Sequence, residues 1–131
     1  MSNAILIAAA LVGLAVAGPA DARSPLEGRW DRKDMQIEIK PCGASLCGTV
    51  VSASAKQKAR AQNGSDTNLV GATLIRQIQP TGRQTYRARV FLPDRNMNAS
   101  GRITQLTPDR LRVSGCLLAV ICRTTHWDRV H

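Results

Sequence analysis

Short segments in which apolar and polar residues alternate are the feature that most constrains the fold of this chain. In residues 35–40 (MQIEIK) every second residue is apolar, and residues 85–92 (TYRARVFL) follow the same pattern. Successive side chains of a strand point to opposite faces, so this period indicates strands that bury one face. Turn-forming residues at 80–82 and 107–109 separate such segments. The pattern predicts an all-β fold, a small antiparallel up-and-down β-barrel or sandwich of seven to eight strands.

The remaining strands are expected where the alternation returns. They span residues 47–52, 73–79, 102–106, 110–113 and 125–129. Residues 54–64 differ, because their Ala, Lys, Gln and Arg favour a helix. We expect a short basic surface helix there, or a loop, with Ser54 as the N-cap and Asn63-Gly64 as the end. Residues 93–101 (PDRNMNASG) are rich in turn formers and predict an irregular link.

The N-terminus carries an apolar, uncharged run at residues 4–17. The run is shorter than the roughly 20 residues that cross a bilayer, and a small-residue motif, ADA, follows it and ends at Ala22. This combination is typical of a secretory signal peptide. We therefore predict a signal peptide at residues 1–22 and a single β-barrel domain at residues 23–131. After cleavage near Ala22 this domain would be periplasmic or secreted, and it would not span a membrane.

Four cysteines stand in two close pairs, Cys42 with Cys47 and Cys116 with Cys122. Export would place them in an oxidising compartment, where thiols form disulfides. Pairing within each local segment is favoured, and cross-pairing that staples distant strands is the alternative. A four-thiolate zinc site prefers shorter spacing than the second pair has, and a redox motif would need C-x-x-C. We therefore expect structural disulfides, no metal and no cofactor.

Lysine and arginine outnumber aspartate and glutamate by 18 to 9, which gives a formal net charge of +9. Such a surplus favours anionic partners. Aromatic residues make up only 3% of the chain, too few for the stacking that single-stranded nucleic acid requires, so we expect no nucleic-acid partner. The candidate ligand-binding residues lie on and beside the arginine-rich outward faces of the strands: Tyr86, Arg87, Arg89, Arg102 and Arg112. The other interpretation of these arginines is ordinary surface charge.

Three local patterns together resemble a known family. They are GRW at residues 28–30, CGASLCGTVV at 42–51 and LRVSGCLLAVICRTTHWDRV at 111–130. This combination is similar to an uncharacterised bacterial envelope family, domain of unknown function 2147, over most of residues 26–130. The G-x-W element also resembles the first-strand signature of the lipocalin-like (calycin) barrels.

The lipocalin-like resemblance implies a structural role for three residues. Trp30 would pack across the closed end of the barrel, with a late basic residue, Arg129 or Arg123, over its ring. Such a guanidinium–indole contact is favourable by about 0.5–2 kcal/mol. Gly28, Trp30 and Arg129 are therefore expected to hold the barrel together rather than to bind a ligand.

Two classes of function fit these features. The first is an exported, monomeric barrel that binds a lipid or another amphipathic anionic small molecule in its mouth. The alternative is an envelope interaction protein without a cavity, which docks acidic partners through the arginine-rich face. An enzyme is the third hypothesis, since His126 and Asp128 share one face of a strand and a carboxylate can orient an imidazole. No nucleophile motif accompanies them, so we expect a protein without catalytic activity.

Overall fold

The structure is a computed structural model that describes residues 23–118 and 121–131. The predicted signal peptide, residues 1–22, lies outside the described residues.

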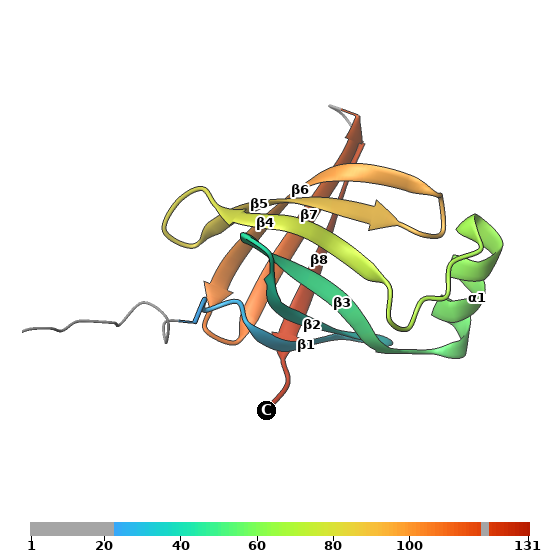
Figure 1. The fold of residues 1–131 in the computed structure, drawn as a ribbon, viewed down its shortest axis with the longest axis horizontal. Helices are drawn as coiled ribbons and strands as arrows, with labels where there is room; N and C mark the ends of the chain where they lie inside the picture. The colour runs from blue at the N-terminus through green and yellow to red at the C-terminus, as the bar shows by residue number, and fades with distance from the viewer. Residues whose placement is uncertain (1–22, 119–120) are drawn as a thin grey trace, which may run out of the picture.

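Eight antiparallel strands follow one another around a closed barrel (Figure 1). They are β1 (Gly28–Arg32), β2 (Met35–Cys42), β3 (Ser45–Ala53), β4 (Thr73–Pro80), β5 (Thr85–Leu92), β6 (Met97–Thr107), β7 (Arg110–Leu118) and β8 (Ile121–Arg129). The ring closes where Trp30 and Asp31 of β1 lie opposite Arg129 and Asp128 of β8. The all-β prediction is confirmed, and the architecture is an up-and-down barrel rather than a sandwich.

The expected irregular link at residues 93–101 was wrong over its second half. The strand β6 already begins at Met97, and Ala99 lies opposite Val90 of β5. Gly101 is needed here because a Cβ on it would come within 2.7 Å of the Val90 side chain. Gly101 is therefore small because the Val90 side chain occupies the space beside it.

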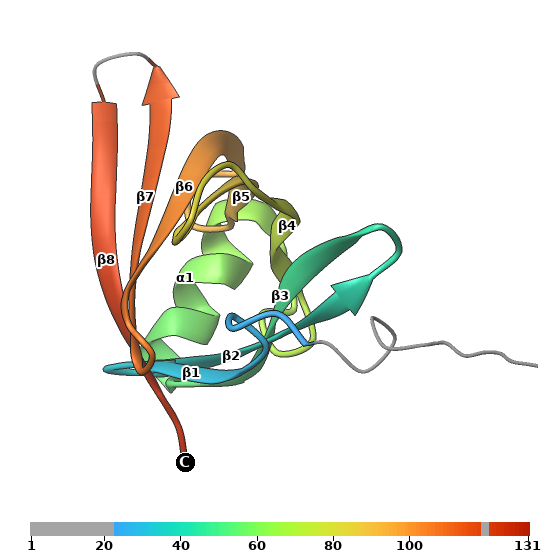
Figure 2. The ribbon, with the colours of Figure 1, turned by 90° about the vertical axis from the view of Figure 1, so that its left-hand side faces the viewer.

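The expected helix is present as α1 (Ala55–Ser65), and it connects β3 to β4. Ser54 is its N-cap, and the Ser54 hydroxyl accepts a hydrogen bond from the backbone N–H of Gln57 at 3.2 Å. The helix ends at a left-handed C-cap, Asp66, two residues beyond the expected end at Asn63-Gly64. Figure 2 looks through the barrel and shows α1 across its far end.

The other end of the barrel is closed around Trp30. Trp30 of β1 and Leu26, which lies in the turn before β1, are both fully buried. The Trp30 indole N–H donates to the Leu26 carbonyl at 2.8 Å, which anchors this turn across the opening. The buried amide of Gln105 donates to the carbonyls of Pro25 and Pro108, each at 3.3 Å. The turn before β1 and the β6–β7 turn are thereby joined.

Arg129 is the cation that covers the Trp30 ring, with its guanidinium carbon 4.3 Å from the ring centroid. The same guanidinium donates to the carbonyls of Pro25 at 2.7 Å, Glu27 at 2.9 Å and Pro108 at 3.2 Å. Gly28 leaves room for it, since a Cβ at this left-handed position would lie 2.7 Å from an Arg129 nitrogen. Arg123, the other candidate, lies elsewhere, in the lining of a cavity.

The core lies inside the barrel, on the inward phase of each strand. The apolar residues of the alternating segments are mostly buried: Met35, Ile37, Ile39, Tyr86, Ala88, Leu111 and Val113. Val90 is partly buried and packs against them. The helix adds little to this core, because only Ala61 of α1 is buried.

Two disulfides join neighbouring strands near their connections. Cys42 pairs with Cys47 across the β2–β3 turn, and Cys116 pairs with Cys122 near the tip of the β7–β8 hairpin. The predicted local pairing is confirmed. Each bridge closes a short loop, so each is expected to contribute less than the roughly 3 kcal/mol of a 15-residue loop.

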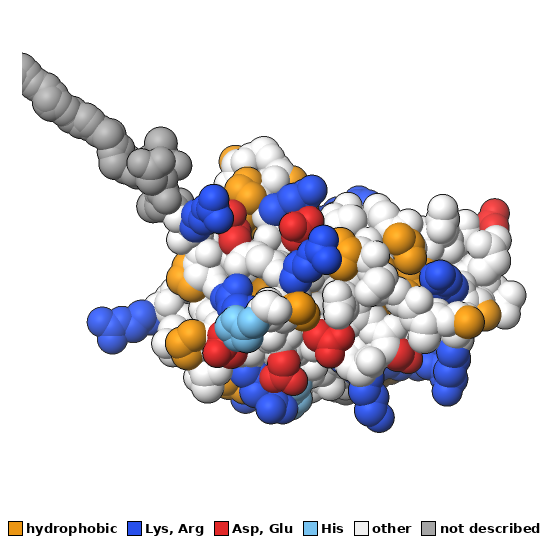
Figure 3. All heavy atoms as spheres, turned by 90° about the horizontal axis from the view of Figure 1, so that it is seen from below, with side chains coloured by type: hydrophobic (Ala, Val, Ile, Leu, Met, Phe, Trp, Pro, Cys, Tyr) orange, Lys and Arg blue, Asp and Glu red, His pale blue; other side chains and the backbone are white. Residues whose placement is uncertain are grey.

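The barrel surface on the side of β1 and β2 mixes charges of both signs, as the view from below shows (Figure 3). Lys40 and Glu38 of β2, for example, lie 3.9 Å apart. In the part of the chain that the structure describes, no helix is both long enough and apolar enough to cross a membrane.

Replacing Arg129 with alanine is expected to lower the free energy of unfolding by about 2–4 kcal/mol. The variant loses the cation–π contact, and three backbone carbonyls lose a charged donor. Urea denaturation followed by tryptophan fluorescence measures the loss. Arg83→Ala, an exposed arginine in the β4–β5 turn, is the matched control and should change stability by less than about 0.5 kcal/mol. An equal loss in both variants would contradict the structural role of Arg129.

Candidate ligand-binding site

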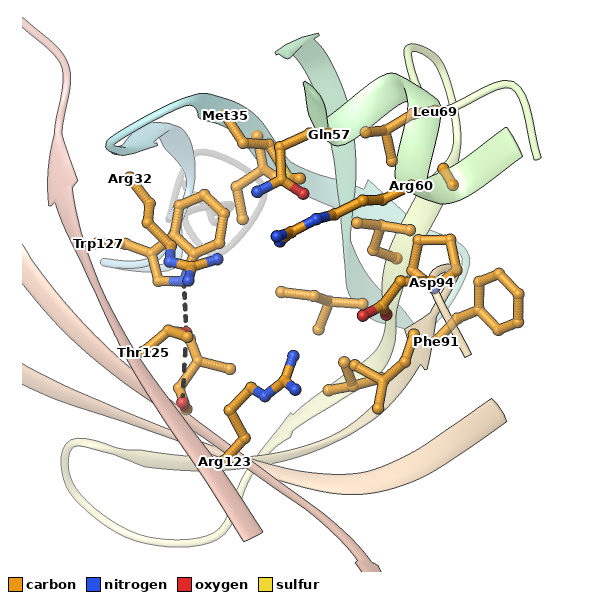
Figure 4. A pocket seen from close by; sticks show the side chains of 18 residues that line it. Arg32, Met35, Gln57, Arg60, Leu69, Phe91, Asp94, Arg123, Thr125 and Trp127 are labelled. Carbon is orange, nitrogen blue, oxygen red and sulfur yellow. Dashed lines mark hydrogen bonds between the residues drawn. The ribbon is translucent and has the colours of Figure 1, made fainter. Parts of the chain in front are cut away.

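The end of the barrel that α1 covers holds a cavity of about 160 Å³ (Figure 4). The opposite end is filled by Trp30 and Leu26, so the barrel has one closed end and one hollowed end. Side chains from α1, from the adjoining ends of β1 and β2, from the β5–β6 turn and from β8 line the cavity. Access from solvent is therefore between the helix and the strands that face it.

The apolar part of the lining comes from the barrel interior. Besides Trp127, its buried members are Met35, Ile37, Ala61, Leu69, Leu74, Ile75 and Val113. Trp127 of β8 adds an indole to one wall, and its N–H donates to the Thr125 hydroxyl at 3.1 Å. Thr125 in turn donates to the Val113 carbonyl at 3.5 Å. The Trp127 ring is thereby fixed with its polar edge satisfied, which leaves apolar ring surface for contact with a ligand.

The polar part of the lining is dominated by arginine. Arg32 at the end of β1, Arg60 of α1 and Arg123 of β8 all line the cavity, and Figure 4 shows the Arg60 and Arg123 side chains reaching into it. Asp94, in the β5–β6 turn, is the carboxylate among the lining residues. Among the described residues, no carboxylate lies within ion-pair distance of these three guanidinium groups. With three arginines and one aspartate, the lining carries an excess of positive charge.

Arg32 also contacts the aromatic wall. Its guanidinium carbon lies 6.0 Å from the Trp127 ring centroid, the outer limit of a cation–π interaction. This contact keeps one cation at the edge of the apolar surface. A ligand that stacked on Trp127 would thus meet a guanidinium beside the ring.

The helix that covers the cavity is held at both of its ends. At the N-terminal end, the Asp34 carboxylate in the β1–β2 turn accepts a hydrogen bond from the side-chain amide of Gln57 at 3.1 Å. The backbone carbonyl of Asp34 accepts one from the Ser54 N–H at 2.9 Å. The Gln57 hydrogen bond lowers the pKa of Asp34 below its usual value. At the other end, a Cβ on Gly64 would collide with the backbone carbonyls of Pro93 and Asp94. This close contact fixes the helix against the β5–β6 turn.

The structure places the ligand-binding residues suggested by the sequence away from the cavity. Tyr86 is buried in the core, and the arginines at 87, 89, 102 and 112 are exposed on the outer barrel wall. His126 and Asp128 are exposed on the outer side of β8, where Asp128 lies 3.8 Å from Arg110. None of these residues lines the cavity under α1.

The cavity arginines were missed, although the sequence carries a signal for two of them. Arg32 follows Trp30 by two residues on β1, and Arg123 precedes Thr125 by two on β8. Both therefore share the inward phase of their strands, where arginine is unusual. Arg60 offers no comparable signal, because the periodicity of α1 does not reveal which side faces the barrel.

Comparisons with known proteins agree with this architecture. The family model described as "Uncharacterized protein conserved in bacteria (DUF2147)" matches residues 28–129. No curated protein matches the sequence. Among solved structures, protein HP1028 from the human pathogen Helicobacter pylori, described as a member of the lipocalin family, is similar with a TM-score of 0.60 and 12% identity. The match covers 81% of this chain and 83% of that one, and it is a likeness of fold.

The anchoring of α1 by Asp34 predicts a pH dependence. Because the folded-state pKa of Asp34 is lowered, its contribution to stability is present above the unfolded pKa, about 4, and is lost as the pH falls through the folded value. Asp34→Asn should therefore be less stable than the parent protein at pH 7, and the difference should shrink below about pH 4. Urea unfolding at pH 7 and pH 3 measures both values. A difference independent of pH would contradict the role of the carboxylate.

Proposed function

This chain belongs to the bacterial DUF2147 family and folds as a lipocalin-like barrel, and on that basis we propose that it binds a small amphipathic anion in the cavity under α1. The proposal rests on one observation, the meeting of three arginines with an apolar cavity. Guanidinium groups offer paired N–H donors that match carboxylate, sulfonate or phosphate oxygens. Such a head group would neutralise the positive charge of Arg32, Arg60 and Arg123. The apolar body of the ligand would contact Trp127 and the barrel interior.

The size of the cavity limits the apolar body of the ligand. A volume of about 160 Å³ is close to that of an engineered apolar cavity that accepts benzene, about 150 Å³. The body should therefore resemble one aromatic ring or a chain of about six carbons. A long-chain fatty acid would leave much of its chain outside the barrel, so the volume favours the smaller end of the amphipathic class.

Binding rather than catalysis is the activity we propose. The cavity lining, over the described residues, contains no histidine, cysteine or serine. The Thr125 hydroxyl is engaged by Trp127 and Val113, so it is not placed beside a general base. The lining supplies fixed positive charge and apolar surface, which serve recognition of an anion.

The charge preference is tested with matched ligands. Benzoate and hexanoate should bind at least about tenfold more tightly than benzyl alcohol and hexan-1-ol, because only the acids meet the guanidinium groups. Isothermal titration calorimetry at low salt measures each affinity. In the Arg60→Gln/Arg123→Gln variant, the affinity for the acids should fall to the affinity for the alcohols. Lys56→Gln/Lys58→Gln removes the same charge from exposed positions of α1 and should keep the preference.

Two results would contradict this proposal. One is equal binding of acids and alcohols to the parent protein. The other is an equal loss of acid binding in both double variants, which would show that net charge rather than the cavity attracts the anion. Native mass spectrometry of protein purified from its producing cells complements the titration, because a retained ligand would appear as an adduct of defined mass.

We also propose that the protein is exported before it folds. The signal-peptide pattern at residues 1–22 supports this, and two disulfides are typical of oxidising compartments. Expression of the full chain in a bacterial host, followed by fractionation and N-terminal sequencing, tests it. We expect a periplasmic protein that begins at Arg23. A cytoplasmic protein that retains Met1 would contradict export.

A further inference from the structure

The outer wall of the barrel formed by β4, β5, β6 and β7 carries arginine without any acidic residue. These four consecutive strands contain no aspartate or glutamate. Five of their exposed arginines, which we call the cationic wall, are Arg76, Arg87, Arg89, Arg102 and Arg112. The sixth, Arg110 at the start of β7, is not counted with them because it lies 3.8 Å from Asp128 of β8. The opposite side, on β1 and β2, mixes both signs of charge (Figure 3). The surplus of positive charge is therefore unevenly distributed.

The strand register places arginines of the cationic wall directly opposite one another. Arg76 of β4 lies opposite Arg89 of β5, and Arg87 of β5 lies opposite Arg102 of β6. Directly opposite residues in an antiparallel pair have Cβ atoms about 5 Å apart, and like charges there destabilise the sheet. Arg112 extends the series to β7, because its partner Thr104 is two residues from Arg102. The folded protein thus contains a repulsion that a bound anion would relieve.

A shallow groove crosses this wall beside an irregularity in β4. The register between β4 and β5 shifts after Arg76, and Gln77 has a left-handed backbone with φ of 53°. The groove is lined by polar side chains of Ser45, Gln77, Gln79, Arg87, Arg89 and Ser100. Gln79 accepts two hydrogen bonds from Arg87, at 2.8 and 3.3 Å, and this holds one guanidinium in place.

We infer that the cationic wall binds a linear anionic polysaccharide. The arginines stand on four adjacent strands, and neighbouring strands lie about 4.8 Å apart. This arrangement matches a chain with repeated carboxylate or sulfate groups. The amides and hydroxyls of the groove match sugar hydroxyls. Among the described residues, no aromatic side chain lines the groove, so none of them would stack on nucleic-acid bases. These lining residues also include no large apolar side chain that would enter a bilayer. This surface is separate from the cavity under α1 and does not depend on the function proposed for it.

The test uses one member of each opposed pair. Arg89→Gln/Arg102→Gln should weaken binding to heparin and to alginate by about tenfold or more, since two of the guanidinium groups that would pair with the anion are lost. The same variant should unfold at a higher temperature than the parent protein in the absence of polymer, because the repulsion is removed. Lys56→Gln/Lys58→Gln, with the same loss of charge, is the control. It should change the polysaccharide affinity by less than about threefold and the unfolding temperature by less than about 2 °C. Titration calorimetry and thermal unfolding at 50 mM and 200 mM salt, roughly the range over which screening changes, measure both.

Each contrary outcome is distinct. Equal weakening by the two double variants would show attraction by net charge alone and would overturn the inference. Tighter binding of duplex DNA, or of vesicles of anionic phospholipid, than of both polysaccharides at equal salt would also overturn it. Arg60→Gln/Arg123→Gln should retain polysaccharide binding, so failure of the cavity proposal and failure of this one can be told apart.

Discussion

The barrel depends on the contact that joins its first and last strands. Between β1 and β8 the ladder is short, with Trp30 opposite Arg129 and Asp31 opposite Asp128. A closed sheet has no free edge only if this seam holds. Arg129 reinforces it by covering the Trp30 ring and by donating to carbonyls of two different turns. The seam is therefore held by this guanidinium as well as by its short backbone ladder.

This seam also gives the two ends of the barrel different character. Trp30 and Leu26 are fully buried at one end, and the cavity lies at the other end, under α1. There the bulk comes from α1, which buries little of its own surface and is held mainly through Asp34 and Gly64. A cap of this kind closes an opening without filling it, because the helix contributes Gln57 and Arg60 rather than large apolar side chains. The cavity is thus a consequence of how each end is covered.

Much of this architecture could be predicted from the sequence, because a half-buried strand has a period that single residues reveal. The strands, the inward core and the short-range disulfides all follow from such local signals. The start of β6 was not predicted, since Gly101 is small for a tertiary reason, the closeness of the Val90 side chain. The cavity arginines were not predicted either, because Arg32, Arg60 and Arg123 meet only after the chain has closed.

The connectivity of the barrel has a consequence for how the chain reaches its native state. Every ladder except β1–β8 joins strands that are consecutive in the sequence. The protein chain can therefore form most of the sheet by successive local steps. The β1–β8 ladder alone joins the two ends of the domain and bears the loop-closure entropy of nearly the whole chain. Its closure is therefore the natural last step of assembly, and an open, curved sheet is the intermediate that the topology favours. In such an intermediate both edge strands would be available for pairing with another molecule until Arg129 reaches its carbonyl partners.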